Sequence, residues 1–246
     1  SYNFDERNFK KVTVIADINP ELTSYKAEPV RQRFEFKPQS ITRSGDKKFV
    51  IDFGQNFAGF ARLVLRNVGK QKITLRFAEM LNEDGSLYTE NIRMASAQDT
   101  YISKGDSEEV WEPFFTYHGF RYVEISGLEN IDDRTVLGIS INSLPEQTAS
   151  FTSSDSRLNN LFECILWNQK SNYLDIPTDC PQRDERFGWT GDAVSYFPTA
   201  AFNFDVSSFY QNWFENLFDA QRLDGALPPF APLADMGVGP VCFNSA

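Results

Sequence analysis

Short apolar runs and turn-forming residues alternate over the first part of the chain. Residues 49–53 alternate apolar and polar side chains, Gly54 follows them, and the runs 60–66 and 73–77 come next. Later runs of the same kind lie at 100–103, 110–111, 120–125 and 136–141. Such runs, rich in β-branched and aromatic residues, are typical of antiparallel strands. The pattern therefore predicts an antiparallel β-sandwich in which Gly54 ends one strand.

Beyond residue 150 the apolar positions change to helical spacing. One stripe follows a cap at Ser153 or Ser154 and a start near Asp155, and it comprises Leu158, Leu161, Phe162, Ile165 and Leu166. Apolar residues three and four positions apart share one face of a helix. The stripe therefore predicts an amphipathic helix after a side-chain cap.

A second and broader stripe predicts another helix, capped by Asp205 or Ser207 and ended by Gly225 and the Pro228-Pro229 pair. Its apolar residues are expected to pack in a core rather than bind a ligand, and they are Phe209, Tyr210, Trp213, Phe214, Leu217 and Phe218.

A third helix is expected over 193–202, interrupted by Pro198. Its start is expected near Asp192, whose carboxylate suits the positive end of a helix. The fold class that follows is multidomain, β then α. The chain divides into three predicted regions: a linker or remnant of a preceding domain at 1–36, the β-sandwich at 37–147, and a helical domain at 148–246.

Charge narrows the class of partner. The formal net charge is −10 and the isoelectric point is ≈ 4.7. Such a chain repels phosphate backbones and anionic lipid, so neither nucleic acid nor a membrane surface is an expected partner. Neutral sugars are not excluded as partners by this charge. No apolar run approaches the roughly 20 residues that a membrane helix requires.

The three cysteines are Cys164, Cys180 and Cys242. Their number is odd and no Cys-x-x-Cys occurs, so neither a disulfide framework nor a zinc site is indicated. Reduced, buried thiols are the expectation. The cysteines do not fix the redox compartment, so the sequence leaves the localisation open.

Candidate chemistry concentrates in the segment 175–192, where two prolines and two glycines exclude a continuous helix and predict a loop. Its charged and aromatic residues are Asp175, Asp179, Arg183, Asp184, Glu185, Arg186, Phe187, Trp189 and Asp192. Carboxyls held close together raise the pKa of at least one of them, as a general acid requires, and arginines orient the rest. The indole of Trp189 suits the C–H face of a sugar ring.

The residues by themselves leave other interpretations open. A solvated acidic loop or a structural ion-pair network has the same composition as this segment. The single histidine, His118, is expected to be structural, and Asp52 and the Asp84-Gly85 pair are expected to form turns rather than a cation site. No metal is expected. Trp111 and Trp167 are expected in the core.

A long stretch, 179–192, closely resembles the signature of bacterial α-L-rhamnosidases, glycoside hydrolase family 78. The segments 53–59, 76–80 and 111–121 resemble the β-sandwich that precedes the catalytic domain in that family. The resemblance extends over residues 28–240. It implies that the helical region is the first part of an (α/α)₆ barrel, and that the activity is release of terminal, non-reducing α-L-rhamnose with inversion.

The resemblance also assigns roles to residues of this chain. It implies that Glu185 is the general acid, that Asp179 and Asp192 hydrogen-bond rhamnose hydroxyls, and that Asp192 helps to hold the acid. Trp189 matches the aromatic residue that lines the rhamnose subsite, and Arg183 matches a motif residue near the sugar. No cofactor is implied, and the expected partner is a rhamnose-containing glycoside or polysaccharide.

In the family the general base is a glutamate much further along, and this chain ends at Ala246 with room for three or four helices rather than twelve. The expectation is therefore an incomplete barrel that is inactive alone and exposes an apolar face. Such a chain is expected to pair with another copy of itself, to aggregate, or to be a piece of a longer protein. Two alternatives stay open: a non-catalytic sugar-binding or assembly module, and a glycosidase with another substrate on the same barrel.

Overall fold

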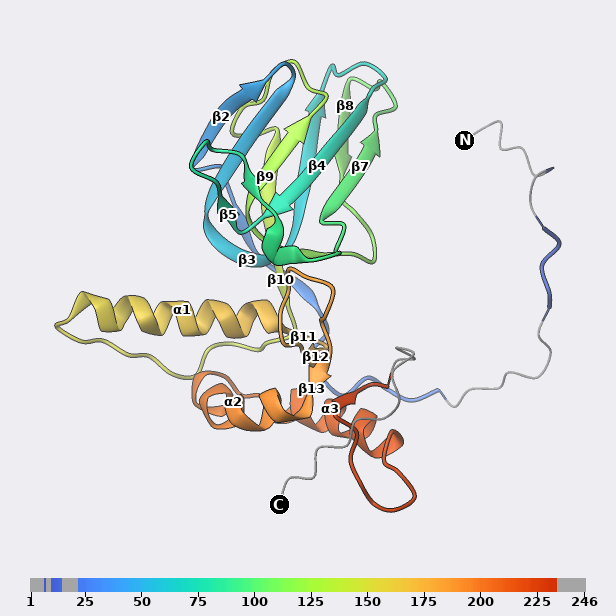
Figure 1. Cartoon of the computed structure of the whole chain (residues 1–246), viewed down its shortest axis with the longest axis vertical. Coiled ribbons are helices and arrows are strands. Elements are labelled where there is room, and N and C mark those ends of the chain that lie inside the picture. Colours follow the sequence, from blue (N-terminus) through green and yellow to red (C-terminus); the bar gives the residue numbers. More distant parts are fainter. Residues whose placement is uncertain (1–6, 8–9, 15–21, 234–246) are drawn as a thin grey trace.

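The computed structural model describes residues 7, 10–14 and 22–233, and within them an antiparallel β domain precedes three helices (Figure 1). Cys242 lies outside the described residues. The elements of the β domain are β1 Arg31–Phe36, β2 Ser40–Gly45, β3 Lys48–Arg66, β4 Lys72–Ala78, β5 Met80–Leu81, β6 Leu87–Tyr88, the short 3₁₀ helix η2 Glu90–Ile92, β7 Gln98–Ile102, β8 Glu108–Trp111, β9 His118–Ser126 and β10 Val136–Asn142.

One long strand, β3, organises the β domain. Its first half pairs with β2 and β9, and its second half pairs with β10 and β8. Gly54 does not end a strand, as the sequence pattern had predicted. It lies inside β3 with φ of 76°, where the register to β9 shifts between Asp52 and Phe57. A left-handed glycine at such an irregularity bends the strand without breaking it.

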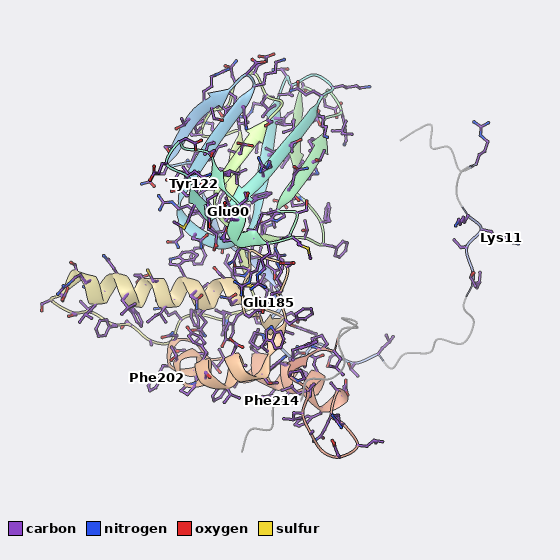
Figure 2. All side chains as sticks on the ribbon, viewed as in Figure 1. Lys11, Glu90, Tyr122, Glu185, Phe202 and Phe214 are labelled. Atoms are coloured by element: carbon purple, nitrogen blue, oxygen red, sulfur yellow. The ribbon has the colours of Figure 1, made fainter. Side chains whose placement is uncertain are left out.

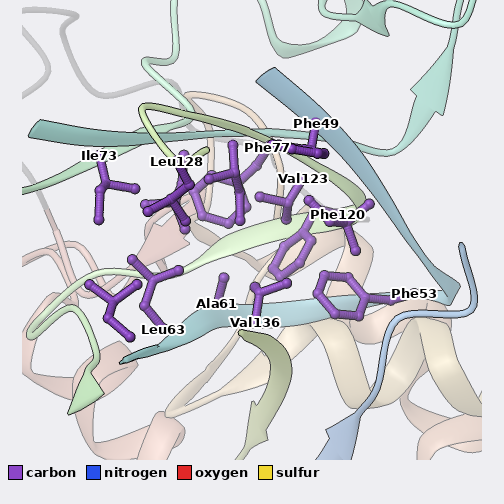
Figure 3. Packing of buried hydrophobic residues seen from close by; sticks show 14 of the residues in the cluster. Phe49, Phe53, Ala61, Leu63, Ile73, Phe77, Phe120, Val123, Leu128 and Val136 are labelled. Atoms are coloured by element: carbon purple, nitrogen blue, oxygen red, sulfur yellow. The ribbon is translucent and has the colours of Figure 1, made fainter. Parts of the chain in front are cut away.

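The bend lets the sheet enclose a core. Phe49, Ile73 and Phe77 lie on one side of this core, and Ala61, Leu63 and Val136 lie on the other (Figure 3). Phe120, Val123 and Leu128 fill the space between them, and all three are at most 1% exposed. Successive side chains along each strand point to opposite faces, so one face of each strand lies in a common apolar interior.

The sheet begins before the predicted sandwich boundary at residue 37. Strand β1, Arg31–Phe36, pairs with β10 along its length, with a register shift between Gln32 and Phe34. As an edge strand, β1 has a polar sequence, so the pattern of apolar residues did not predict it. Its partner β10 supplies the backbone hydrogen bonds.

The helical part lies beyond β10, with α1 between the sheet and the other two helices (Figure 1). Its elements are α1 Ser156–Asn172, β11 Tyr173–Leu174, β12 Ile176–Pro177, β13 Gly188–Trp189, α2 Thr190–Asn203, α3 Ser207–Asp219 and β14 Phe230–Ala231. No helix among the described residues is both long and apolar enough to cross a lipid bilayer.

The helix boundaries differ in detail from the sequence prediction. Asp155, rather than Ser153 or Ser154, caps α1, because its side chain accepts a hydrogen bond from the Arg157 amide. Helix α2 begins at Thr190 and continues through Pro198. The proline leaves the carbonyl four residues earlier without its helical partner, and that residue, Val194, is 73% exposed to solvent.

In the helical part, two expectations about burial were wrong. In the stripe of α3, Phe209, Tyr210, Trp213 and Leu217 are buried, whereas Phe214 and Phe218 are 40% and 65% exposed. The helix also ends at Asp219, before Gly225. Cys180 is buried as expected, but Cys164 is exposed on α1.

An aromatic contact joins the two parts of the chain. The ring of Trp167 on α1 lies 5.2 Å from that of Phe34 and 5.5 Å from that of Phe36, measured between centroids. The Lys170 ammonium lies 4.7 Å from the Trp167 ring. Trp167 therefore packs at the edge of the β-domain core rather than inside a helical core. Trp111 is also only half-buried, stacked on Tyr101.

Candidate active site

The segment 175–192 between α1 and α2, called the acidic loop below, is anchored at its C-terminal end. Strand β13 pairs with β14, with Gly188 opposite Ala231 and Trp189 opposite Phe230. A Cβ atom on Gly188 would lie 2.5 Å from the Ala231 carbonyl oxygen and 2.6 Å from Trp213 Nε1, so only glycine fits there. Trp213 Nε1 itself donates to that carbonyl at 3.0 Å. The end of the loop is thereby fixed against α3.

The same loop rests on the β domain. A Cβ atom on Gly119 of β9 would lie 2.7 Å from Pro181 Cγ and 3.0 Å from the backbone nitrogen of Gln182. Arg186 donates to the Tyr117 carbonyl oxygen at 2.9 Å, and its guanidinium lies 4.5 Å from the Tyr117 ring. Strand β9 and the residue before it therefore support the loop from the sheet side.

The loop opens into a pocket of about 390 Å³. Its lining brings together all five residues that the resemblance singled out, together with a glycine and a proline: Asp179, Arg183, Glu185, Trp189, Gly191, Asp192 and Pro229. Residues of the loop, of β13 and of the first turn of α2 thus converge on one space, as the loop prediction required.

Two arginines hold Glu185, which lies between the sheet and the helices (Figure 2). Arg183 Nε and Nη2 lie 2.9 Å and 2.8 Å from Glu185 Oε2. Arg93, just after η2 in the β domain, donates to the same oxygen at 3.2 Å. Both cations bond one carboxylate oxygen, so the orientation of the Glu185 carboxyl group is set from both parts of the chain.

The sequence did not identify Arg93, because the feature that marks this residue is its backbone conformation in the folded chain. Arg93 has φ of 56°, a left-handed conformation that is uncommon for a residue other than glycine. Backbone angles cannot be read from residue types, and Arg93 lies 92 positions from Glu185. Only the folded chain brings the pair together.

Asp179 is the carboxyl in the pocket with a shifted pKa. Burial raises the pKa of Asp179, and the negative charge of Glu185 adds to the rise. Hydrogen bonds from the Cys180 thiol and from the Phe187 amide, at 3.1 Å to Oδ1, offset part of this rise in the pKa. The other carboxylate oxygen, Oδ2, is buried without a hydrogen-bond partner, with Arg183 Nη2 3.9 Å away.

A second unpaired group lies in the same pocket. Trp189 Nε1 is buried without a hydrogen-bond partner. Its ring is held edge-on against Phe187 and Phe230, with centroids 6.3 Å and 5.1 Å away. An unpaired buried donor or acceptor costs about 1–3 kcal/mol, a cost that a ligand hydroxyl removes. Two residues that line the pocket, Asp179 and Trp189, therefore each carry a buried polar atom without a partner in the described chain.

The remaining charged residues of the loop do not all join the site. Asp192 lines the pocket from the first turn of α2 and is exposed. Two arginines bond Glu185, and a role of Asp192 in holding the acid stays a prediction. Asp184 lines a different pocket on the β-domain side, and Arg186 bonds Tyr117 rather than a carboxylate. The cluster is therefore smaller than the sequence indicated.

One trio in the described residues has the geometry of a metal site. Asp179, Cys180 and Glu185 each offer a ligand atom within 4.8 Å of the others. Burial raises the pKa of the Cys180 thiol to about 11, with the hydrogen bond to Asp179 as a further cause. In the structure the thiol and the Asp179 carboxyl form a hydrogen-bonded pair beside Glu185. The absence of a metal remains an expectation.

Other candidates have structural roles. His118 is buried, stacked on Phe77 at 4.1 Å between ring centroids, with Nε2 3.1 Å from Asp99 Oδ1. Asp52 binds the Arg121 guanidinium through both oxygens at 2.7 Å. Asp84 accepts from the Ser86 amide beside Gly85, whose φ is 80°. The turn at Asp84-Gly85 is as predicted, whereas Asp52 forms an ion pair as well as a turn.

The fold and the site define a class of protein, a concanavalin-like β domain followed by the start of a six-hairpin glycosidase domain. The profile of the bacterial alpha-L-rhamnosidase concanavalin-like domain matches residues 42–142, and that of the bacterial alpha-L-rhamnosidase 6 hairpin glycosidase domain matches residues 146–242. The chain belongs to the bacterial α-L-rhamnosidases, glycoside hydrolase family 78. The predicted order of a β domain and then the first helices of an (α/α)₆ barrel is confirmed.

Relatives match nearly the whole chain but only part of their own length. An alpha-L-rhamnosidase of Streptomyces avermitilis is 40% identical over 97% of this chain and 24% of its own length. One of Formosa agariphila is 38% identical over 94% of this chain and 25% of its own length. The chain thus spans about a quarter of the length of these curated relatives.

Solved structures agree with this placement. The Streptomyces avermitilis alpha-L-rhamnosidase complexed with L-rhamnose superposes with a TM-score of 0.85 at 40% identity, covering 89% of this chain and 21% of that one. The alpha-L-rhamnosidase from Dictyoglumus thermophilum superposes with a TM-score of 0.81 at 40% identity, covering 84% of this chain and 24% of that one.

Proposed function

We propose that this chain carries the acid side of an inverting α-L-rhamnosidase site, which releases terminal, non-reducing α-L-rhamnose from a glycoside or polysaccharide. The observation that carries the proposal is the pair of unpaired buried atoms, Asp179 Oδ2 and Trp189 Nε1, in one pocket with Glu185. The membership of the family supports rhamnose as the sugar.

In this proposal the residues divide the work by their chemistry. Glu185 protonates the glycosidic oxygen as the bond to rhamnose breaks. Asp179 accepts a hydrogen bond from a rhamnose hydroxyl, Asp192 binds a second hydroxyl at the open side, and Trp189 packs against the ring. Arg183, joined by Arg93, fixes the acid, and the carboxylates stabilise the developing oxocarbenium charge. No cofactor takes part in this reaction.

Inversion sets a condition on the base. Inverting glycosidases separate acid and base by about 6.5–9.5 Å so that a water molecule fits between. The closest oxygens of Asp179 and Glu185 lie within 4.8 Å of each other. Asp179 is therefore too close to Glu185 to be the inverting base, and a different carboxylate fills that role in the proposed mechanism.

The test compares this chain with its Glu185→Gln variant on nitrophenyl α-L-rhamnoside and on an alkyl α-L-rhamnoside. The chain is expected to be inactive alone. Any turnover that is measured is expected to fall in the variant by about 100-fold or more on the alkyl substrate and by less on the aryl one, because nitrophenol leaves with little protonation. Proton NMR of the first-formed rhamnose gives the anomer, and a β product is expected. An α product would contradict inversion and assign Asp179 as a nucleophile.

The alternative function is a non-catalytic module that binds rhamnose. The exposed position of Asp192 and the open pocket favour it as much as they favour an active site. It predicts that rhamnose shifts the thermal unfolding midpoint of the chain while neither substrate is turned over, with or without Glu185→Gln.

A further inference from the structure

The β domain carries a pocket of about 420 Å³ that shares no residue with the pocket of the acidic loop. Strands β2, β3 and β9 form its floor, and the turn between β5 and β6 forms one wall (Figure 1). Residues directly opposite each other on neighbouring strands project on the same face of a sheet. Two such rows form the floor, one of Ser40, Asp52 and Tyr122 and the other of Thr42, Val50 and Glu124. The floor therefore consists of paired strands rather than of a loop.

The wall of this pocket is fixed to the sheet by a small apolar cluster. The cluster comprises Val50, Ala78 and Leu87, which are buried, together with Leu81 and Tyr122, which pack against them. Within the turn, Asp84 Oδ1 accepts hydrogen bonds from the amide and the hydroxyl of Ser86, at 2.9 Å and 2.6 Å. Wall and floor are thus both formed in the free chain, as is usual for a ligand pocket.

Two carboxylates of the floor are oriented by cations. The Glu124 side chain is only 5% exposed, and its two oxygens bond Lys48 Nζ at 2.9 Å and Arg76 Nη1 at 3.2 Å. Asp52 binds the Arg121 guanidinium through both oxygens, each at 2.7 Å. These ion pairs neutralise the floor and hold both carboxylates in place.

The remaining cation of the lining is also engaged. Arg43 donates to the Glu129 carbonyl oxygen at 2.7 Å, and its guanidinium lies 4.7 Å from the Phe49 ring. An anion therefore meets no uncommitted cation among the residues that line this pocket. A cation meets carboxylates that already accept hydrogen bonds. The charges of the pocket thus favour a neutral ligand.

Four hydroxyl groups of the lining are not engaged in this way. They belong to Ser40, Thr42, Ser44 and Tyr122, and in the described part of the chain no hydrogen bond joins them to another group. A hydroxyl group can donate one hydrogen bond and accept others. The oxygens of Glu124 also keep acceptor capacity, because each bonds only one cation. The pocket therefore offers several donors and acceptors on a rigid floor.

We propose that this pocket binds a neutral sugar residue and is a second carbohydrate site, separate from the acidic loop. The hydroxyls of a sugar match free hydroxyls and oriented carboxylate oxygens, since each sugar hydroxyl both donates and accepts. A peptide helix or a lipid chain requires a broad apolar groove, whereas the apolar side chains of this lining are Val50, Leu81 and Tyr122. The β domain then binds saccharide in addition to supporting the acidic loop.

Saturation-transfer difference NMR tests this inference. The neutral probes are the methyl glycosides of D-glucose, D-galactose, D-mannose and L-rhamnose, and the anionic probes are D-glucuronate and glucose 6-phosphate. Each is titrated into the chain and into its Asp179→Ala variant, in which the pocket of the acidic loop lacks an acceptor. At least one neutral glycoside is expected to bind both chains with a dissociation constant in the millimolar range.

A pair of double variants locates the binding. Thr42→Ala with Tyr122→Phe removes two free hydroxyls and is expected to weaken binding about fivefold or more. Thr74→Ala with Tyr88→Phe makes the same chemical changes on β4 and β6, outside the lining, and is expected to leave binding unchanged. If Tyr122→Phe does not fold, Ser44→Ala with Thr42→Ala makes the test at two exposed positions.

Four results would each overturn the inference. The first is that none of the neutral glycosides binds, and the second is that all binding disappears in Asp179→Ala. The third is tighter binding of the anionic probes than of the neutral ones, because the pocket then selects charge. The fourth is an equal loss of affinity in the two double variants. None of these measurements depends on Glu185, so the proposed function is tested separately.

Discussion

Asp179 shows how one side chain connects stability with binding. Its side chain is 8% exposed, one oxygen is bonded to the Phe187 amide, and the other has no hydrogen-bond partner. A carboxylate in this position lowers the stability of the folded chain until a ligand pairs with it. The arrangement is typical of binding sites, where groups that destabilise the free protein are satisfied by the ligand.

The pH dependence of stability provides a test of this arrangement. The pKa of Asp179 is raised in the folded chain, so its contribution to stability is fully present below the pKa of an unfolded aspartate and is lost as the pH rises through the folded pKa. Asp179→Asn is therefore expected to gain stability relative to the wild type as the pH rises above the pKa of an unfolded aspartate, about 4. Thermal unfolding measured across this range checks the prediction.

A control with the opposite sign is Asp52→Asn. The hydrogen bonds from Arg121 lower the pKa of Asp52, so its stabilising contribution is present above the pKa of an unfolded aspartate and is lost as the pH falls through the folded pKa. The loss of stability caused by Asp52→Asn should therefore become smaller as the pH is lowered. A difference between wild type and Asp179→Asn that does not vary with pH would show that Asp179 ionises normally.

Trp189 tests the donor in the pocket. Trp189→Phe keeps an aromatic ring beside Phe187 and Phe230 but removes the unpaired N–H. We expect a loss of about 1 kcal/mol in rhamnose affinity, roughly fivefold to tenfold, with little loss of stability. Isothermal titration of rhamnose with both chains measures this directly. Unchanged affinity would mean that the sugar uses only the ring face.

At the residue scale, the sequence indicated the loop residues but not all of their partners. Asp179, Arg183 and Glu185 lie within seven positions, so their proximity follows from the chain itself. Arg93 bonds Glu185 from a distant segment, and Arg186, expected to neutralise a carboxylate, bonds Tyr117 instead. Residue types state what a side chain can bond, but not which of several candidates it reaches.

At the scale of elements, the contact between β9 and the acidic loop is the one most open to a test. Gly119→Ala places a methyl group 2.7 Å from Pro181 Cγ and 3.0 Å from the Gln182 nitrogen. Overpacking of this kind costs about 1–3 kcal/mol and is expected to displace the loop. Denaturant unfolding gives the free-energy change, and Trp fluorescence reports the displacement of the loop.

Gly69→Ala is the matched control, because a Cβ atom there meets no atom within 4 Å and no positive φ is involved. It is expected to be neutral or slightly stabilising. Equal effects of the two substitutions on unfolding and on rhamnose binding would show that the sheet does not support the loop.

The strand pattern gave the type of most elements but not their connections. Gly54 has the residue type of a strand end, yet β3 passes through it because hydrogen bonds to β2, β9 and β10 hold both sides. Pro198 stays within α2, where the carbonyl that it leaves without a helical partner belongs to the solvent-exposed residue Val194. A local breaker ends an element only where neighbouring elements do not supply compensating contacts.

At the scale of the whole molecule, an apolar face of the helical part is exposed. Phe202 and Phe214 belong to α2 and α3, the two helices that lie beyond α1 from the sheet (Figure 2). Val194, Phe202 and Phe218 are 73%, 76% and 65% exposed. Exposed apolar patches of this kind mark surfaces that another polypeptide covers. Self-association of the 246-residue chain therefore remains a prediction.

Sedimentation velocity over a range of concentrations tests this prediction. The chain is expected to sediment as species larger than a monomer as its concentration rises, and Phe202→Lys with Phe218→Lys is expected to restore the monomer. Ile102→Lys, at a site 70% exposed on β7, is the control and should leave association unchanged. A monomer at all concentrations would contradict self-association through this face.

The sequence by itself determined the class of the two parts and the chemistry of the loop, because periodicity and residue type are local properties. Only the tertiary structure decided which groups complete the site. The pairing of Arg93 with Glu185, the support of the loop by Gly119, and the unpaired atoms of Asp179 and Trp189 depend on contacts between distant segments. Packing and burial arise from the whole fold, so no local pattern encodes them.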